Sequence, residues 1–249
     1  MTWILDFLIY LRLSCFHFEH DIIYYNITTI ILISSIIPRT YQLLKIERIT
    51  LEGNYVLLRP PLITDEFGLS LAAKDGEIWN NPYAFFPTEN DIFAFLQDLL
   101  SGSNSFLPFI IINKKSNIIV GSTRYLNIDY DNHRMEIGHT WVRKSFRRTA
   151  VNTETKLLML QYAFEILNCI AIEIRTDVLN TVSRRAIERL GAKEDGILRN
   201  HKIMKNGRIR DTICYSIIKS EWPLVKENPL QKMNHYDNNY VCPVIRESS

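Results

Sequence analysis

The stretch "RKSFRRTAVNTETKLLMLQYAFEIL" (residues 143–167) joins a cluster of basic side chains to a segment with helical periodicity. Its apolar residues recur at the spacing of one helix face, at Leu157, Leu160, Phe164 and Leu167. Neighbouring apolar residues widen this stripe, so the pattern predicts a helix over 152–167 that is buried on most sides. Asn152 or Thr153 is the expected N-cap.

A helix that starts beside a basic turn is a natural anion site. Its first N–H groups are free and carry a partial positive charge. The preceding turn adds the cations Arg143, Lys144, Arg147 and Arg148. An expected strand over 135–142 leads into this turn, and a strand, basic loop and helix in that order suit a pyrophosphate ligand. A solvated basic loop beside an ordinary cap explains the same residues.

The pattern outside this stretch predicts a mixed sheet. A strand (49–61) with a turn at 52–54 is followed by two helices (63–76 and 90–102), capped by Thr64 and by Thr88 with Asp91. Two hairpins, a single strand on each side of the long helix, and a helix capped by Asn180 and ended by Gly191 complete the order. The hairpins span 106–113 with 117–129, and 201–218 through Asn206-Gly207. The single strands span 134–144 and 169–175, and the helix spans 180–192. This order predicts an α/β (α+β) fold with helices on both faces of the sheet.

The 249 residues suit one sizeable domain with extensions, and 47% hydrophobic with 22% charged residues indicates a globular chain. We expect an apolar extension (1–45), a domain (46–226) and a polar tail (227–249). The apolar runs of the extension fall short of the ~20 residues that span a bilayer. A weak membrane-associated segment, an additional structural arm and a start codon placed too far upstream are the open explanations. The tail lacks periodicity, so we expect it to cover the surface or to be mobile.

Composition argues against several other classes of protein. The net charge of +2 indicates no nucleic-acid partner. The cysteines (Cys15, Cys169, Cys214 and Cys242) are far apart, and no metal-ligand spacing is present, so we expect no metal site, reduced thiols and a cytoplasmic location. The chain contains no P-loop motif and no GxSxG nucleophile motif.

Four segments, in this order and spacing, resemble the GCN5-related N-acetyltransferase (GNAT) superfamily, in particular its ribosomal-protein N-terminal acetyltransferases. They are "MEIGHTWV", "RRTAVNTETKLL", "NTVSRRAIERLGA" and "GRIRDTICYSIIKSEWP", and the resemblance covers about residues 50–223. It implies the GNAT fold and acetyl-CoA as cosubstrate. The family's Q/R-x-x-G-x-G/A loop falls on residues 147–152, where Ala150 and Asn152 replace the glycines. The cofactor-binding residues that the resemblance implies are Trp141, Val142, Arg143, Arg147, Arg148, Thr149, Ala150, Val151, Asn152, Thr153, Asn180 and Ser183.

The resemblance also implies direct transfer of an acetyl group to a primary amine in a ternary complex. Glu136 would be the base, and strand alternation would place Gly138 and Thr140 on its side. A backbone N–H near Trp141 or Val142 would hold the oxyanion, and Ser183 would protonate the leaving thiolate. A surface carboxylate at Glu136 and a simple helix cap at Asn180 are the alternatives.

The acceptor site of the resembled fold would be bordered by Trp79 and Tyr83, with Phe86 nearby, and by Arg210 and Asp211. Core packing of the aromatic residues and an ion pair within the hairpin are the alternatives. Tyr125 and Tyr215 are expected to pack in strands. The acceptor is a protein N-terminus or a small amine, and the protein a monomer or homodimer. A non-catalytic CoA-binding module is the main alternative function; a nucleic-acid-binding protein and a peripheral membrane protein are less well supported.

Overall fold

The computed structural model describes residues 48–102 and 105–245. The expectations for the apolar extension 1–45 lie outside these residues. The described residues all fall in one compact unit that includes the C-terminal segment. Among residues 48–102 and 105–245, no helix is long and apolar enough to cross a lipid bilayer.

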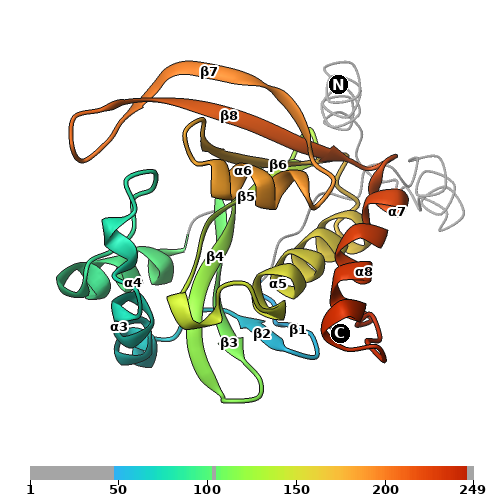
Figure 1. The fold of residues 1–249 in the computed structure, drawn as a ribbon, viewed down its shortest axis with the longest axis horizontal. Coiled ribbons are helices and arrows are strands. Elements are labelled where there is room, and N and C mark those ends of the chain that lie inside the picture. The colour runs from blue at the N-terminus through green and yellow to red at the C-terminus, as the bar shows by residue number, and fades with distance from the viewer. Residues whose placement is uncertain (1–47, 103–104, 246–249) are drawn as a thin grey trace, which may run out of the picture. The chain divides into compact units, whose positions relative to one another are not determined.

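The centre of the fold is an eight-stranded mixed sheet, as the sequence predicts (Figure 1). Neighbouring strands follow the order β1-β2-β3-β4-β5-β6-β8-β7, and every pair is antiparallel except β5 with β6. The strands are β1 (Leu51–Glu52), β2 (Val56–Arg59), β3 (Phe106–Asn113), β4 (Ile118–Asp129), β5 (Arg134–Val142), β6 (Ala171–Asp177), β7 (Lys193–Ile203) and β8 (Ile209–Ile218).

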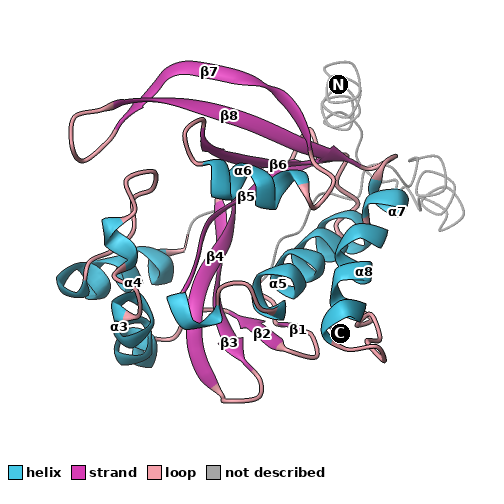
Figure 2. Ribbon diagram, viewed as in Figure 1, coloured by secondary structure: helices cyan, strands magenta, loops and turns pink. Residues whose placement is uncertain are grey.

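Helices cover both faces of this sheet (Figure 2). Alternation along β3 divides the core: Ile111 packs with the cluster that contains α5, whereas Ile110 and Ile112 pack with α3 and α4. The helices are α3 (Glu66–Lys74), α4 (Ile92–Ser101), α5 (Ala150–Gln161), α6 (Thr181–Glu188), α7 (Trp222–Val225) and α8 (Glu227–Tyr236). A π-helical turn (Tyr162–Ile166) continues α5, and short 3-10 turns lie at Ile63–Asp65, Ile78–Asn80, Glu89–Asp91 and Lys144–Phe146.

Helix α5 is held in place by one buried carboxylate. Glu154 is fully buried, and its oxygens accept the backbone N–H groups of Asn54, Tyr55 and Val56 at 2.7–2.8 Å. The turn between β1 and β2 therefore hydrogen-bonds directly to the first half of α5. A side chain at Gly53 would collide with the same carboxylate, which explains the glycine in the predicted turn.

Strands β5 and β6 pair over only three residues and then separate. The parallel pairs run from Arg134 with Ala171 to Glu136 with Glu173, although β5 continues to Val142 and β6 to Asp177. The facing edges of the two strands beyond Glu136 and Glu173 consequently have no strand partner in the described part of the chain. A gap between parallel strands exposes backbone hydrogen-bonding groups to a ligand.

Several local expectations were wrong. The tail is not irregular throughout, because residues 227–236 form α8, which buries Pro229 and Met233. Two apolar positions gave too weak a periodicity to predict it. The last hairpin starts at Lys193 rather than at residue 201, because β7 is an exposed edge strand without apolar alternation. The strand expected over 169–175 begins at Ala171 instead, and Ile170 before it is exposed.

The expected helix caps were confirmed in part. Thr88 Oγ1 donates to Asp91 at 2.7 Å at the start of α4, and Gly191 follows α6 with φ of +98°. At the start of the helix that leads into α3, Asp65 rather than the expected Thr64 is the capping residue. Its carboxylate accepts the backbone N–H of Leu62 at 2.7 Å. Asp65 also pairs with Arg59, so an acidic residue with a cationic neighbour replaces the expected hydroxyl.

Candidate functional site

The gap between β5 and β6 presents a free backbone donor. Arg143 N donates to Val120 O at 2.8 Å, and the register continues with Gly121 opposite Val142 and Ser122 opposite Trp141. Along a strand of an antiparallel ladder, residues whose backbone N–H faces the partner strand alternate with residues whose N–H faces away from it. The N–H of Trp141 therefore faces β4, whereas that of Val142 faces the gap.

A bulge in β5 turns Thr140 away from Glu136. The register between β4 and β5 shifts between Ser122 and Arg124, and His139 takes a φ of +48° at this point. Gly138 stays on the side of Glu136, since a Cβ built on it would lie 3.1 Å from the Glu136 carboxylate. The expectation that Thr140 shares this side was wrong, because the extra residue of the bulge reverses the alternation.

On the α5 side of the bulge, Thr140 forms a hydrogen bond with the buried Lys156. Lys156 of α5 donates to Thr140 Oγ1 at 2.6 Å, and Thr140 Oγ1 lies 2.7 Å from Thr123 Oγ1. Burial lowers the pKa of Lys156 to about 7. Among the described residues, no carboxylate pairs with Lys156. The sequence pattern did not single out this lysine, although a cation within an otherwise apolar helical stripe was a visible signal.

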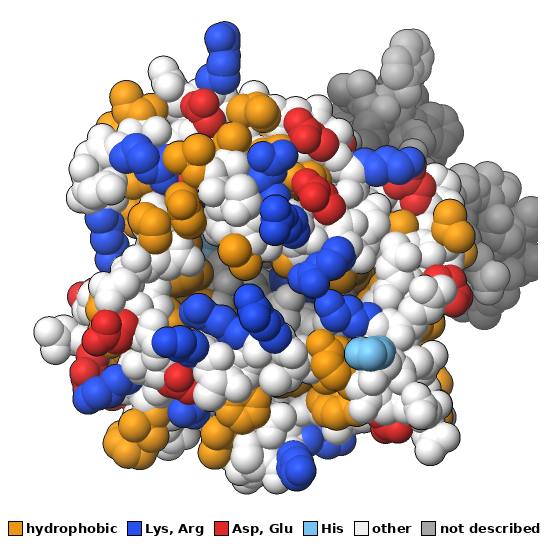
Figure 3. Space-filling model, viewed as in Figure 1, with side chains coloured by type: hydrophobic (Ala, Val, Ile, Leu, Met, Phe, Trp, Pro, Cys, Tyr) orange, Lys and Arg blue, Asp and Glu red, His pale blue; other side chains and the backbone are white. Residues whose placement is uncertain are grey.

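The basic turn lies where the sequence predicted it, directly before α5. The helix starts at Ala150, and Thr149 is the N-cap, whose Oγ1 accepts the N–H of Val151 at 3.4 Å. Caps at Asn152 or Thr153 were therefore wrong by one turn. Arg143 pairs with Asp75 at 2.7 Å, whereas Arg147 and Arg148 are exposed and form no ion pair with any described residue. Figure 3 shows Lys and Arg side chains around a hollow between α6 and the start of α5.

Asn180 is the N-cap of α6, as predicted. Its Oδ1 accepts the backbone N–H of Ser183 at 3.1 Å, and Ser183 is half-buried in the first turn of the helix. Tyr215 and Tyr125 are buried strand residues, which confirms their expected packing role. Tyr215 also accepts a hydrogen bond from Arg184 and donates to Glu188, so it anchors α6 to β8.

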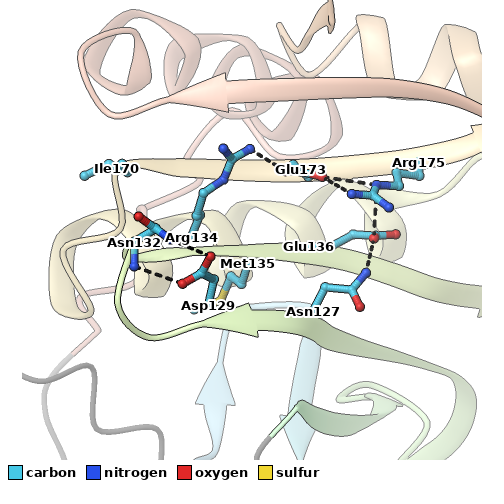
Figure 4. Close-up of a pocket in the computed structure, with 9 residues that line it drawn as sticks. All are labelled: Asn127, Asp129, Asn132, Arg134, Met135, Glu136, Ile170, Glu173 and Arg175. Atoms are coloured by element: carbon cyan, nitrogen blue, oxygen red, sulfur yellow. Dashed lines mark hydrogen bonds and ion pairs between the residues drawn. The ribbon is translucent and has the colours of Figure 1, made fainter. Parts of the chain in front are cut away.

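Glu136 lies at the last parallel pair before the strands separate, and its side chain is only 8% exposed. Asn127 Nδ2 donates to its Oε2 at 2.8 Å, and Arg175 Nε lies 3.5 Å from the same oxygen (Figure 4). Burial raises the pKa of Glu136, while Arg175 and Asn127 counteract this effect. A surface carboxylate is therefore the wrong description of Glu136.

A pocket of about 510 Å³ opens beside this carboxylate. Its lining includes Asn127, Glu136, Glu173 and Arg175, and it extends along the paired part of β5 and β6 toward Arg134 (Figure 4). Met135 and Ile172 pack in the core cluster of α5, so alternation places Glu136 and Glu173 on the opposite face of the sheet. No group of His, Cys, Asp or Glu in the described residues is arranged to hold a metal ion.

The residues expected at the acceptor site are brought together only in part. Arg210 Nη1 donates to Tyr83 O at 3.3 Å, so the last hairpin touches the loop after α3. Trp79 packs against the cluster of α3 and α4. The alternative for Arg210 and Asp211, an ion pair within the hairpin, is absent from these residues: Arg210 lies 4.0 Å from the buried Asp177, and Asp211 accepts the N–H of Asn200.

A model of the family described as "Acetyltransferase (GNAT) domain" matches residues 56–193, more than half of the chain. The chain belongs to the GNAT acetyltransferase family. It is therefore an acyltransferase, and acetyl-CoA is the acyl donor typical of the family. The match covers the sheet from β2 to β6, helices α3 to α6 and the basic turn.

Similar proteins carry related names. An "Uncharacterized N-acetyltransferase p20" of Bacillus licheniformis is 28% identical over 57% of this chain and 78% of its own length. A "Putative ribosomal N-acetyltransferase YdaF" of Bacillus subtilis (strain 168) is 35% identical over 39% of this chain, which spans about half, 51%, of that relative. A GCN5-related N-acetyltransferase of Brucella melitensis superposes with a TM-score of 0.68 at 32% identity, over 75% of this chain and 86% of that chain.

The GNAT loop of this chain departs from the family pattern at Ala150 and Asn152, yet the backbone accommodates both residues. Neither has a positive φ, and both lie in the first turn of α5. The glycines are therefore not required for a left-handed conformation here. The free N–H groups of this turn, Arg147, Arg148 and the open edge of β5 fit an acyl-CoA whose pyrophosphate lies at the helix start.

Proposed function

We propose that this GNAT protein transfers the acetyl group of acetyl-CoA directly to the α-amino group of a protein N-terminus, with Glu136 as the base. One observation carries the proposal: a buried carboxylate with a raised pKa lies where β5 and β6 separate, beside an open pocket. When bound, acetyl-CoA supplies an activated thioester. The protein must then remove a proton from the amine, stabilise the oxyanion and protonate the thiolate.

Glu136 suits the first of these tasks. An α-ammonium group has a pKa of ~8, so a nearby carboxylate that accepts its proton increases the reactive fraction at neutral pH. Burial favours the protonated carboxyl and thereby makes Glu136 a stronger base than an exposed glutamate. The proton passes from the amine to Oε1 or Oε2, directly or through a water in the pocket, and is later released to solvent.

Groups in the gap between β5 and β6 and on α6 suit the other two tasks, stabilisation of the oxyanion and protonation of the thiolate. The Val142 N–H, which faces the gap, is our proposed donor to the oxyanion. Ser183 is the proposed proton donor to the thiolate, and Asn180 combines its cap with a contact to the pantetheine arm. Arg147 and Arg148, with the N–H groups of Ala150, Asn152 and Thr153, would hold the pyrophosphate. Arg143, Trp141 and Val151, whose N–H donates to the cap Thr149, support that loop.

The acceptor class rests on a relative's name and on the site. The Bacillus subtilis relative is named as a putative ribosomal N-acetyltransferase, which favours a protein N-terminus over a small amine. We place the residues after the acceptor amine against Trp79, Tyr83, Arg210 and Asp211, where the last hairpin approaches the loop after α3. A CoA-binding module without catalysis is the second candidate, favoured by the altered loop at Ala150 and Asn152.

The test compares the whole chain with Glu136→Gln and with Glu194→Gln, an exposed matched control on β7. Acetyl-CoA binding is measured by calorimetry, and transfer by mass spectrometry on peptides with free N-termini and on small amines. We expect unchanged acetyl-CoA affinity in both variants and a loss of 100-fold or more in kcat/KM for Glu136→Gln alone. Full turnover by Glu136→Gln would refute the base, and acetyl-CoA binding without transfer to any acceptor would favour the module.

A further inference from the structure

Two carboxylates compete for one guanidinium beside the proposed base. Arg175 of β6 donates to Glu173 Oε2 from Nε at 3.1 Å and from Nη2 at 2.6 Å. The same Nε lies 3.5 Å from Glu136 Oε2, beyond good hydrogen-bonding distance (Figure 4). Arg175 therefore gives its strong contacts to Glu173 and only a weaker ion pair to Glu136.

The contacts of Glu173 strengthen this asymmetry. Its second oxygen, Oε1, accepts a hydrogen bond from Arg134 of the neighbouring strand, so Glu173 is held from both sides by cations. Glu136 has Asn127 as its hydrogen-bond donor, and the amide carries no charge. Of the two acidic residues at the last parallel pair, Glu173 has its negative charge balanced by two arginines. The buried Glu136 has only a weaker ion pair to balance its charge.

We propose that Glu173 and Arg175 are positioning residues that set how readily Glu136 takes the acceptor's proton. This inference rests on the proposed function, in which Glu136 is the base. When Glu136 gains the proton, its charge disappears, yet Arg175 keeps its partner Glu173 and no guanidinium is left unpaired. The proton can be exchanged with water because Glu136, Glu173 and Arg175 all line the same pocket.

Other charged or titratable groups near Glu136 come from β5 itself and from β6, β7 and β8, whereas β4 contributes the neutral Asn127. Burial is the largest influence on its pKa and raises it; Arg175 and Lys202 lower it, and Glu173 raises it. Arg210 and Cys214 of β8 also interact with Glu136 electrostatically, and Arg134 lies two residues before it. Among these groups, Arg175 contacts both carboxylates, whereas Glu173 acts on Glu136 through its charge alone. The two residues carry opposite charges, so their removal has opposite consequences.

The experiment uses two substitutions with opposite expected signs. Glu173→Gln removes a negative neighbour and frees Arg175 for Glu136, so the acidic limb of the pH profile of kcat/KM should move to lower pH. Arg175→Met removes the cation and should move the limb to higher pH. Each shift should be about one pH unit. Arg199→Met, an exposed arginine on β7, is the matched control and should leave the limb in place.

A second measurement needs no turnover. In protein labelled with ¹³C at glutamate carboxyls, the Glu136 resonance, assigned through Glu136→Gln, is titrated in the wild type and in each variant. Opposite shifts support the proposal, whereas no shift, or shifts of one sign, in folded variants overturn it. If a variant fails to fold, Glu173→Asp and Arg175→Lys replace it, and these should shift the titration in the same directions by less. Full activity of Glu136→Gln would instead refute the proposed role of Glu136 as the base. The titration of the Glu136 carboxyl would then be the remaining test of how Glu173 and Arg175 affect it.

Discussion

Replacement of Lys156 by methionine should make the protein more stable at neutral and acidic pH. Lys156 is buried on α5, and it donates to Thr140 while lacking a carboxylate partner in the described part of the chain. Met fills a similar volume without a charge. The burial of an ammonium group is costly because the charged form loses its hydration.

The magnitude follows from the pKa of this lysine. Burial lowers it from 10.5 to about 7, and one pKa unit corresponds to about 1.4 kcal/mol, so the penalty is roughly 5 kcal/mol. Below pH 7 the lysine is charged in both the folded and the unfolded chain, and the penalty is complete. Between about pH 7 and 10.5 the folded protein has lost the proton and the unfolded chain retains it. The penalty therefore fades as the pH rises through this window.

The assay is urea unfolding of the wild type, Lys156→Met and the exposed control Lys115→Met at intervals from pH 6 to pH 9. The stability advantage of Lys156→Met should be constant near pH 6 and should then fall by about 1.4 kcal/mol per pH unit above pH 7.5. The control should show no such slope. An advantage that does not change with pH would mean that Lys156 titrates normally, and the reasoning from its burial would be refuted.

Three further predictions concern the elements around the gap. Glu154→Gln should lower the free energy of unfolding by about 3 kcal/mol, because an amide cannot accept all three backbone N–H groups; an unchanged urea midpoint would contradict this. Asn180→Ala should cost about 1 kcal/mol through loss of the cap on α6, whereas a neutral effect in thermal unfolding would show that the cap is dispensable. Joint replacement of Arg147 and Arg148 by Gln should weaken acetyl-CoA binding at least tenfold at 50 mM salt and less at 300 mM, as calorimetry would show; equal losses at both would exclude an electrostatic role.

Much of the fold could be predicted from local patterns. The basic turn before α5, the cap at Asn180 and the Gly191 stop are signals within one turn of the helix that they serve. The elements that were missed lack such signals. Strand β7 is exposed, and α8 buries only Pro229 and Met233, so neither has a clear apolar period.

The sequence could propose candidate site residues, but it could not predict their contacts. Strand alternation alone placed Thr140 beside Glu136, and the bulge at His139 reversed it. Asn127 and Arg175, the partners of Glu136, come from other strands, and nothing in their own segments marked them. Lys156, the partner of Thr140, comes from α5, where only its charge within an apolar stripe was a signal.

The sequence by itself determined the order of the elements from β2 to β8, the basic helix start and the family, because these depend on side chains within a few residues of one another. The tertiary structure decided where β5 and β6 separate, which way Thr140 points, and that Glu173 competes with Glu136 for Arg175. Those properties arise from burial and from contacts between residues far apart in the chain, such as Arg175 and Glu136, which are 39 positions apart. The free energy of a charge in such a place depends on neighbours that only folding brings within a few ångströms.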